Sequence, residues 1–92
     1  MKITIRAFAD YGEIIGKEVE LVLHAEKTIG ALLSDLCERY PELGRQMFAQ
    51  SGELKEFINI LINGRNIAFL DNMATRLVDG DVIALFPAVA GG

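Results

Sequence analysis

The chain has 92 residues, 51% of them hydrophobic and 24% charged, which fits one domain built around one hydrophobic core. Its net charge of −4 works against nucleic-acid binding, which depends on attraction to phosphate. The single cysteine excludes an internal disulfide, and no apolar run approaches the roughly 18 residues that a membrane span needs. We therefore expect a soluble protein of the reducing cytoplasm, without nucleic-acid or membrane partners.

Two strands are expected at the N-terminal end. Apolar and polar residues alternate over residues 2–8 and again over residues 17–23, with turn residues at 10–16 between them. The pattern predicts an antiparallel pair whose outer face brings basic and acidic side chains together. These side chains are Lys2 and Arg6 on the first strand, and Glu18 and Glu20 on the second.

One amphipathic helix is expected after the second strand. Thr28 is a suitable N-cap, because its hydroxyl can accept a hydrogen bond from a free backbone N–H of the first turn. Pro41 should end the helix, and residues 42–50 read as loosely helical. The apolar residues with helical spacing are Ile29, Leu32, Leu33, Leu36, Cys37 and Tyr40.

The C-terminal half should add two longer strands and a short one. Residues 57–64 alternate and end in Asn63-Gly64, which favours a type I′ hairpin and predicts a short returning strand over residues 66–69. A turn at residues 77–81 precedes the last strand, residues 82–86. We expect the first and last strands to pair in parallel at the centre, with the helix over one face of the sheet.

Side chains suited to catalysis or metal binding are few. His24, the only histidine, is expected in a turn or at the surface rather than in a catalytic role. Cys37 falls on the apolar stripe of the helix, where an unreactive small hydrophobic residue is expected rather than a nucleophile. We expect no metal site and no intrinsic cofactor, and so no enzyme.

The last nine residues, "ALFPAVAGG", raise two alternatives, a frayed end or a functional tail. A terminal glycine carboxylate is ionised at neutral pH and is a poor acyl donor, so another protein would have to activate it. Residues without side chains would suit a narrow catalytic channel. We expect a domain over residues 1–86 and an extended tail over residues 87–92, which at about 3.3–3.6 Å per residue could enter a partner's active site.

Several stretches together resemble one known family over essentially the whole chain. They are "INILINGRNI", "LVDGDVIALFPAVAGG" with its terminal Gly-Gly, and the insert "PELGRQMFAQSGELKEFINI". They resemble the MoaD/ThiS family of small sulfur carriers, which includes the small subunit of molybdopterin synthase, and the insert is most similar to archaeal ubiquitin-like modifiers. The resemblance implies an α+β, ubiquitin-like β-grasp fold: a mixed sheet, one main helix packed on one face, and an extended C-terminal tail.

The resemblance also implies a chemistry for the tail. In that family an E1-like enzyme adenylates the C-terminal glycine, using its own ATP and Mg, and the acyl-adenylate is converted to a thiocarboxylate. The matching acceptor here is Gly92, with Gly91 as its slender neighbour. The implied partners are the E1-like adenylating enzyme and the large subunit of molybdopterin synthase or another sulfurtransferase. The alternative is a protein modifier that joins Gly92 to target lysines, and a third possibility is a binding module with an idle tail.

Two positions depart from the family's pattern. Ala88 follows Pro87 where many synthase subunits have a second proline, and Tyr11-Gly12 stands where an arginine before the glutamate is common. Both departures argue against a role as a synthase subunit and nothing else, and neither affects Gly92.

An apolar patch is expected on the sheet face opposite the helix. If Ile83 and Leu85 face the helix, the intervening side chains emerge on the other face, with Arg6 and Asn59 at the rim. Either a partner docks there, or the tail or the loop after Pro41 folds over it. The expected partner-binding residues are Phe8, Leu61, Phe86, Pro87 and Val89.

Overall fold

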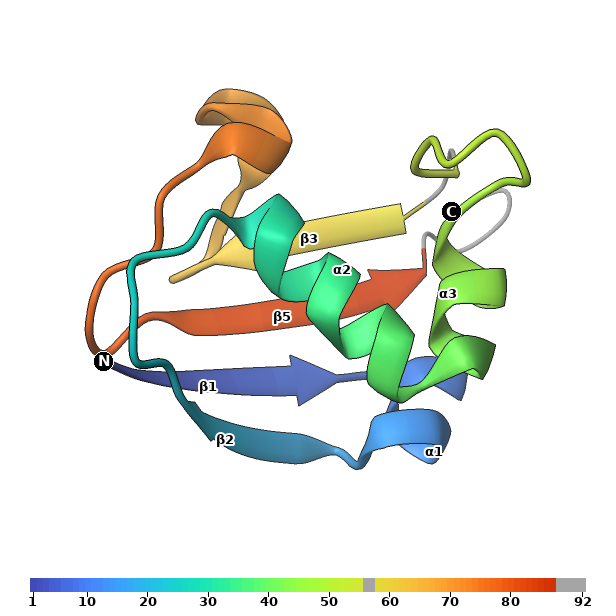
Figure 1. Ribbon diagram of the computed structural model, residues 1–92, viewed down its shortest axis with the longest axis horizontal. Helices are drawn as coiled ribbons and strands as arrows, with labels where there is room; N and C mark the ends of the chain where they lie inside the picture. The colour runs from blue at the N-terminus through green and yellow to red at the C-terminus, as the bar shows by residue number, and fades with distance from the viewer. Residues whose placement is uncertain (56–57, 88–92) are drawn as a thin grey trace.

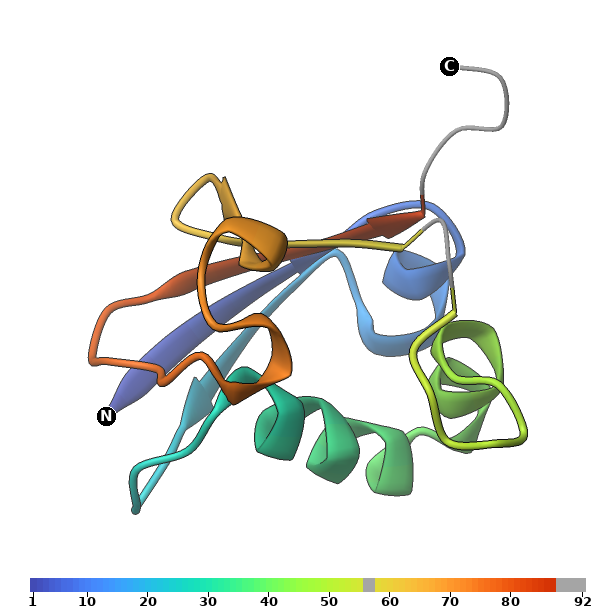
Figure 2. The ribbon, with the colours of Figure 1, turned by 90° about the horizontal axis from the view of Figure 1, so that it is seen from above.

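The computed structural model describes residues 1–55 and 58–87, which form a five-stranded mixed sheet packed against helices. Figure 2 shows α2 and α3 on one side of the sheet and no described α-helix on the other. No described helix is both long enough and apolar enough to cross a membrane. The elements are β1 (Lys2–Ala7), α1 (Asp10–Ile15), β2 (Glu18–Val22), α2 (Ile29–Arg39), α3 (Pro41–Met47), β3 (Ile58–Ile62), β4 (Arg65–Asn66), the 3₁₀ helices η1 (Ile67–Phe69) and η2 (Asn72–Ala74), and β5 (Val82–Pro87).

The strand order β2-β1-β5-β3-β4 places the first and last strands side by side at the centre, as the sequence predicts (Figure 1). β1 and β5 run parallel, with Ile5 opposite Ile83. β2 joins the other side of β1 in the predicted antiparallel pair, and β3 pairs antiparallel with β5. The strand that leads toward the C-terminus is therefore held on both sides.

The core lies between this sheet and the α2–α3 layer. Residues at alternate positions of the two central strands are fully buried against the helices, and each buried aliphatic side chain contributes about 1.5–3 kcal/mol. On α2 the predicted stripe is buried through its first four residues, while Cys37 and Tyr40 at its end are half-buried. The fully buried residues are Ile3, Ile5, Ile29, Leu33, Leu43, Met47, Ile83 and Leu85.

The predicted limits of the main helix are confirmed. The Thr28 hydroxyl accepts a hydrogen bond from the Ala31 N–H at 3.1 Å, and α2 ends at Arg39. Pro41 then occupies the first turn of α3, where its missing N–H costs nothing. The segment expected to be loosely helical is thus a defined helix as far as Met47, because Leu43 and Met47 are buried against the core.

The turn expected at residues 10–16 is instead a short helix, α1. Tyr11 and Ile15 lie four residues apart on one face of it and are buried, and Gly16, with φ of 102°, ends it. A segment of six residues is too short for its periodicity to stand out from turn residues. Contact with β1 and α3 supplies the stability that the isolated segment lacks.

The short strand expected at residues 66–69 is wrong for most of its length. β4 ends at Asn66, whose side-chain oxygen accepts a hydrogen bond from the Ala68 N–H at 2.9 Å and so starts η1. The hairpin before it is as predicted, because Asn63 and Gly64 both have positive φ, at 51° and 85°. Asparagine thus ends the strand by offering the backbone an alternative hydrogen-bond partner.

A buried polar network fixes the start of β5. Asp81 is 4% exposed, and its carboxylate accepts hydrogen bonds from the Asn63 side-chain amide and the Val78 N–H, both at 2.8 Å. The Asn63 oxygen in turn accepts from the Val82 N–H at 2.9 Å. Sequence reasoning assigned Asn63, Val78 and Asp81 only to turns, whereas they connect the β3–β4 turn to the central strand.

Candidate functional site

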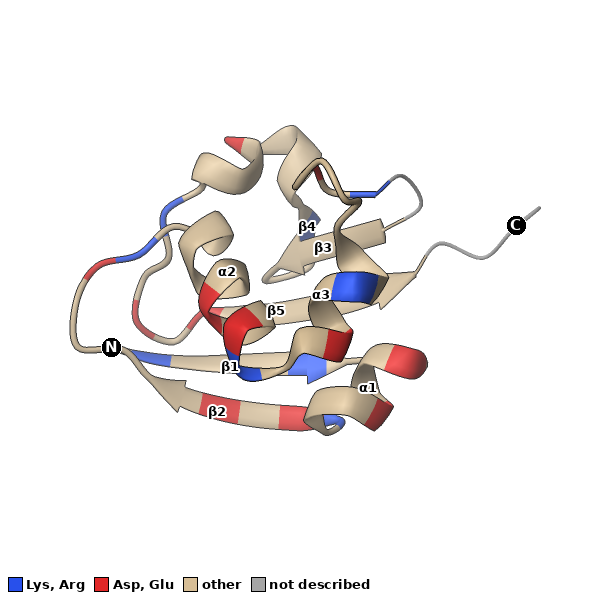
Figure 3. Cartoon of the chain, turned by 45° about the vertical axis from the view of Figure 1, so that its right-hand side comes forward, with Lys and Arg blue, Asp and Glu red and all other residues tan. Residues whose placement is uncertain are grey.

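The sheet face opposite α2 carries three of the predicted partner-binding residues, Phe8, Leu61 and Phe86. Strand alternation places Phe8, Ala84, Phe86 and Leu61 on this face, since their neighbours Ala7, Ile83, Leu85 and Ile60 are buried beneath the helices. Figure 3 shows that the charged residues of the two central strands belong to β1, whereas β3 and β5 carry none. An uncharged strip therefore runs along β5 and β3.

Phe8 and Phe86 form the centre of this surface. Their ring centroids lie 6.0 Å apart with the rings at 90°, an edge-to-face geometry that contributes about 0.5–1.5 kcal/mol beyond simple burial. The Phe8 N–H donates to the Leu85 carbonyl at 3.0 Å, which extends the β1–β5 ladder beyond Ala7. Phe8 is nevertheless 50% exposed, so the backbone fixes an aromatic side chain that solvent still reaches.

A shallow apolar depression lies beside the aromatic pair at the carboxyl end of β5. It has a volume of about 430 Å³ and is lined by Phe8, Ala9, Phe86 and Pro87. We call this set of four residues the aromatic patch. Pro87 pairs with Ile58 and is still part of β5, so the strand runs one residue further than predicted.

The backbone beneath the aromatic patch is constrained. Ala9 has φ of 54° and ψ of −134°, a conformation that costs a non-glycine residue of the order of 1–3 kcal/mol. Its carbonyl accepts from the Gly12 N–H at 3.0 Å at the start of α1. A Cβ at Gly12 would lie 2.7 Å from the Ala7 carbonyl oxygen, so glycine is needed for this close approach.

Tyr11 and Gly12 are therefore positioning residues that sequence reasoning missed. They appeared only as a departure from a family pattern, whereas the structure uses Tyr11 to anchor α1 in the core and Gly12 to bring it against β1. Burial, together with the nearby Asp10 carboxylate, raises the pKa of the Tyr11 hydroxyl. The four-residue spacing of Tyr11 and Ile15 was the signal available in the sequence.

Leu61 shares the open face but not the aromatic patch. It lies opposite Ala84, one row away from Phe86, and Phe86 instead has Asn59 as its neighbour on β3. Arg6 also lies opposite Ala84, and its Nε donates to a Glu18 carboxylate oxygen at 3.1 Å. Leu61, Arg6 and Asn59 thus border the aromatic patch.

The loop after Pro41 does not cover this face as far as the described residues go. α3 packs against α2 and α1, on the opposite side of the sheet (Figure 2). Three other predicted site residues, Val89, Gly91 and Gly92, lie outside the described residues.

The remaining candidates for chemistry lie apart from the aromatic patch. His24 is exposed just after β2, and Cys37 is half-buried beside α3. Burial raises the pKa of the Cys37 thiol, which reduces the thiolate fraction at neutral pH. Within residues 1–55 and 58–87, no group of three His, Cys, Asp or Glu side chains is arranged to hold a metal ion.

Comparisons with known proteins agree with this architecture. The model of the ThiS family matches residues 5–92. Small archaeal modifier protein 3 of Haloferax volcanii is 39% identical over 93 residues that span all of both chains. The sulfur carrier protein CysO of Mycobacterium tuberculosis is 39% identical over 67 residues, 71% of this chain and 72% of CysO. The crystal structure of SAMP1 from Haloferax volcanii has a TM-score of 0.82 at 33% identity and covers both chains completely.

These likenesses confirm the ubiquitin-like β-grasp fold that the resemblance implied. The relatives are named as modifiers and as a sulfur carrier, so the chain is a small carrier-type protein and not an enzyme. The family match extends across nearly the whole sequence, including β5 and the residues that follow it. The chain belongs to the ThiS family.

Proposed function

We propose that this protein acts through Gly92, which an E1-like partner converts to an acyl-adenylate and which then carries sulfur as a thiocarboxylate. In the first step a carboxylate oxygen attacks the α-phosphate of the partner's ATP and releases pyrophosphate. In the second step a hydrosulfide ion attacks the acyl carbon, AMP leaves, and the C-terminus becomes a thiocarboxylate. The chain itself supplies the acyl group and the surface by which the partner holds it.

The position of the aromatic patch at the end of the central strand is the observation that carries this proposal. A partner that grips Phe8 and Phe86 holds the chain at the point where residues 88–92 begin. Those five residues, at about 3.3–3.6 Å each, reach at most roughly 18 Å. Docking at the aromatic patch therefore limits where Gly92 can go, and such positioning is a large part of the rate of a bimolecular reaction.

The aromatic patch also has the chemistry of a docking surface. It is apolar, and the polar residues Arg6 and Asn59 form part of its border. Its centre is an aromatic pair, the type of side chain that dominates binding energy at protein interfaces. Because the backbone hydrogen bonds at Phe8 and Ala9 already fix its shape, little conformational entropy is lost when a partner binds.

Sulfur carriage is the first candidate for the fate of the activated glycine. The similarity of this chain to CysO, a protein named as a sulfur carrier, supports this candidate. We propose molybdopterin synthesis as the pathway that receives the sulfur. Cells that lack this chain should then lose molybdoenzyme activity. An extract of those cells should regain the activity when the thiocarboxylate form of the protein is added. Unchanged molybdoenzyme activity in such cells would assign the sulfur to another pathway.

Conjugation to lysine is the second candidate. The similarity to small archaeal modifier protein 3, which spans both chains completely, favours it. In this case a target lysine amine attacks the acyl carbon and forms an isopeptide bond. Both fates need the same activated Gly92, so one protein can have both.

Mass spectrometry of the full chain, purified from its own cells, separates these fates. A carrier shows an intact mass in which sulfur replaces one terminal oxygen. A modifier leaves its C-terminal segment on lysines of other proteins, which after trypsin digestion is a branch of residues 77–92, because Arg76 is the last basic residue. A variant that lacks Gly92 should show neither product while keeping the wild-type unfolding temperature. If the full chain shows neither product in cells that contain the E1-like enzyme, the proposal fails.

A further inference from the structure

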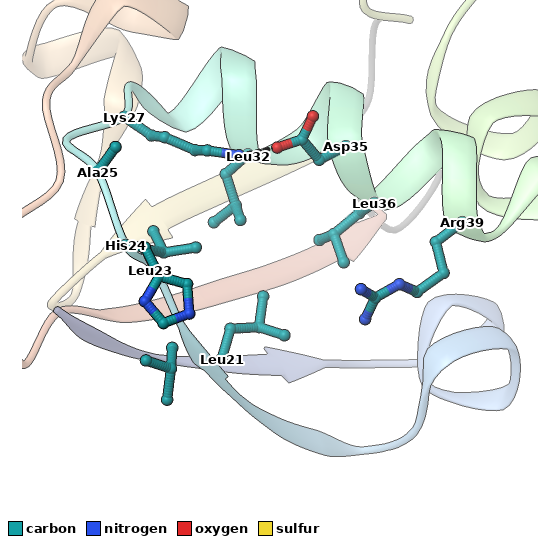
Figure 4. A pocket seen from close by; sticks show the side chains of 10 residues that line it. Leu21, Leu23, His24, Ala25, Lys27, Leu32, Asp35, Leu36 and Arg39 are labelled. Carbon is teal, nitrogen blue, oxygen red and sulfur yellow. Dashed lines mark hydrogen bonds and ion pairs between the residues drawn. The ribbon is translucent and has the colours of Figure 1, made fainter.

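A second groove lies on the opposite side of the molecule, between β2 and α2. It has a volume of about 340 Å³ and shares no residue with the aromatic patch. Figure 4 shows leucines from both elements pointing into it, Leu21 and Leu23 from the strand side and Leu32 and Leu36 from the helix. We call it the β2–α2 groove.

The strand that borders this groove has an open edge. β2 is the first strand in the sheet order, and no described strand pairs with its outer side. Leu23 exchanges two hydrogen bonds with Met1, at 2.7 and 3.0 Å, and at the other end the Ala7 N–H donates to the Lys17 carbonyl at 3.0 Å. Odd-numbered residues of this segment therefore bond to β1. The N–H and C=O groups of Glu18, Glu20 and Val22 point outward.

The rim of the groove carries more positive than negative charge. Lys27 forms an ion pair with Asp35 across the top of the groove (Figure 4). Arg39 extends from α2 over the groove and forms no ion pair with any residue in 1–55 or 58–87. In a chain of net charge −4, this rim is a local site for an acidic ligand.

We propose that the β2–α2 groove binds an extended acidic segment of another protein, which adds to β2 as a sixth strand. Its backbone would pair with Glu18, Glu20 and Val22. Apolar side chains at alternate positions would pack on the leucines of the groove, and an acidic side chain beside them would pair with Arg39. This binding is independent of Gly92, so the protein can hold such a partner while its C-terminus reacts elsewhere.

Charge argues against a second copy of this chain as the occupant. Two copies joined antiparallel through their β2 edges would place one groove beside the other, with Arg39 of both copies along the same seam. Lys27, Glu18 and Glu20 are already neutralised by Asp35, Arg6 and Lys2, so they offer no opposite charge to balance the two guanidinium groups. The like charges of Arg39 disfavour that dimer, whereas an acidic segment from a different protein complements the rim.

A synthetic peptide tests this inference. The probe is acetyl-Asp-Thr-Val-Thr-Ile-Thr-Val-Thr-Asp-amide, which presents the same groove-facing residues in either direction along β2. With the full chain labelled for NMR, the probe should shift amide signals of β2 and α2. It should also slow hydrogen exchange at Glu20 and Val22, whose N–H groups point outward, with little change at Leu21, which is already bonded to β1.

Two variants of the chain locate the binding. Arg39→Glu should weaken binding of the peptide roughly threefold to tenfold, whereas Arg65→Glu, the same charge reversal on the opposite edge strand, should leave it unchanged. Val22→Pro removes one outward N–H without removing a bond to β1, and should weaken binding about tenfold. An unchanged amide spectrum elsewhere in each variant shows that the fold is intact.

Charge in the peptide provides the matching control. Replacing both terminal aspartates by lysine should weaken binding at least as much as Arg39→Glu does. Equal binding of the lysine peptide, absence of slowed exchange at Glu20 and Val22, or shifts confined to Phe8 and Phe86 would each overturn the proposal.

Discussion

Leu85 and Phe86 are neighbours in the same strand, yet their side chains lie on opposite faces of the sheet. Leu85 is 0% exposed beneath the helices, whereas Phe86 is half-buried on the open face and in contact with Phe8. A central strand thus supplies stability from one side and a recognition surface from the other. Because its backbone is paired on both sides by β1 and β3, the open-face side chains keep a fixed spacing without being packed themselves.

The largest loss of stability should come from a substitution on the sheet face that the helices cover. Leu85→Ala would remove a fully buried side chain and leave a cavity, which costs about 2–5 kcal/mol of unfolding free energy. Chemical denaturation measures the loss. Val82→Ala, at a half-buried position of the same strand, is the control and should cost less. Equal losses at the two positions would contradict the distinction between the faces.

Gly12→Ala tests whether the packing of α1 against β1 positions the aromatic patch. The new Cβ would collide with the Ala7 carbonyl oxygen, 2.7 Å away, which displaces α1 and costs about 1–3 kcal/mol. Amide spectra should then show shifts at Phe8 and Ala9, which α1 positions.

Gly44→Ala is the matched control for this change. Its Cβ would meet the Cys37 Cβ at 3.3 Å, a contact that a small displacement relieves, so it should cost less stability and leave the aromatic patch undisturbed. If both variants shift the signals of the aromatic patch equally, α1 does not specifically position it.

Phe86→Asp should change function more than stability. A carboxylate in the aromatic patch would be desolvated by a docking partner, so adenylation by the E1-like enzyme should fall about tenfold, equivalent to about 1.4 kcal/mol. Pyrophosphate exchange measures this step. Phe69→Asp is the same substitution at a side chain that is 82% exposed outside the aromatic patch, and it should leave the rate unchanged. Equal rates for the two variants would exclude Phe86 from docking.

The smallest effect should come from the ion pairs of the open face. In the Arg6–Glu18 pair the nitrogen and oxygen are 3.1 Å apart, and both side chains are more than half exposed. A double-mutant cycle with Arg6→Ala and Glu18→Ala should give a coupling energy of about 0.2–1 kcal/mol that decreases as salt is added. A coupling energy above this range, or one that salt does not change, would show that the open face is less solvated than the structure indicates.

Periodicity in the sequence determined most of the architecture. Alternation over residues 2–8 and 82–86 identified the two central strands, and the 3.6-residue stripe beginning at Ile29 identified the main helix. Asn63-Gly64 fixed the hairpin, because few other residues adopt positive φ at two successive positions. Family resemblance then indicated the β-grasp fold and directed attention to Gly92.

Tertiary contacts decided the rest. α1 exists because Tyr11 and Ile15 find a core to enter, and residues 67–69 form η1 because Asn66 caps it. Alternation predicts which face a side chain occupies, but register decides which side chains meet across strands. Phe8, Leu61 and Phe86 could therefore be assigned to one face from the sequence, whereas only the pairing of β1, β3 and β5 placed Phe8 beside Phe86 and Leu61 one row away.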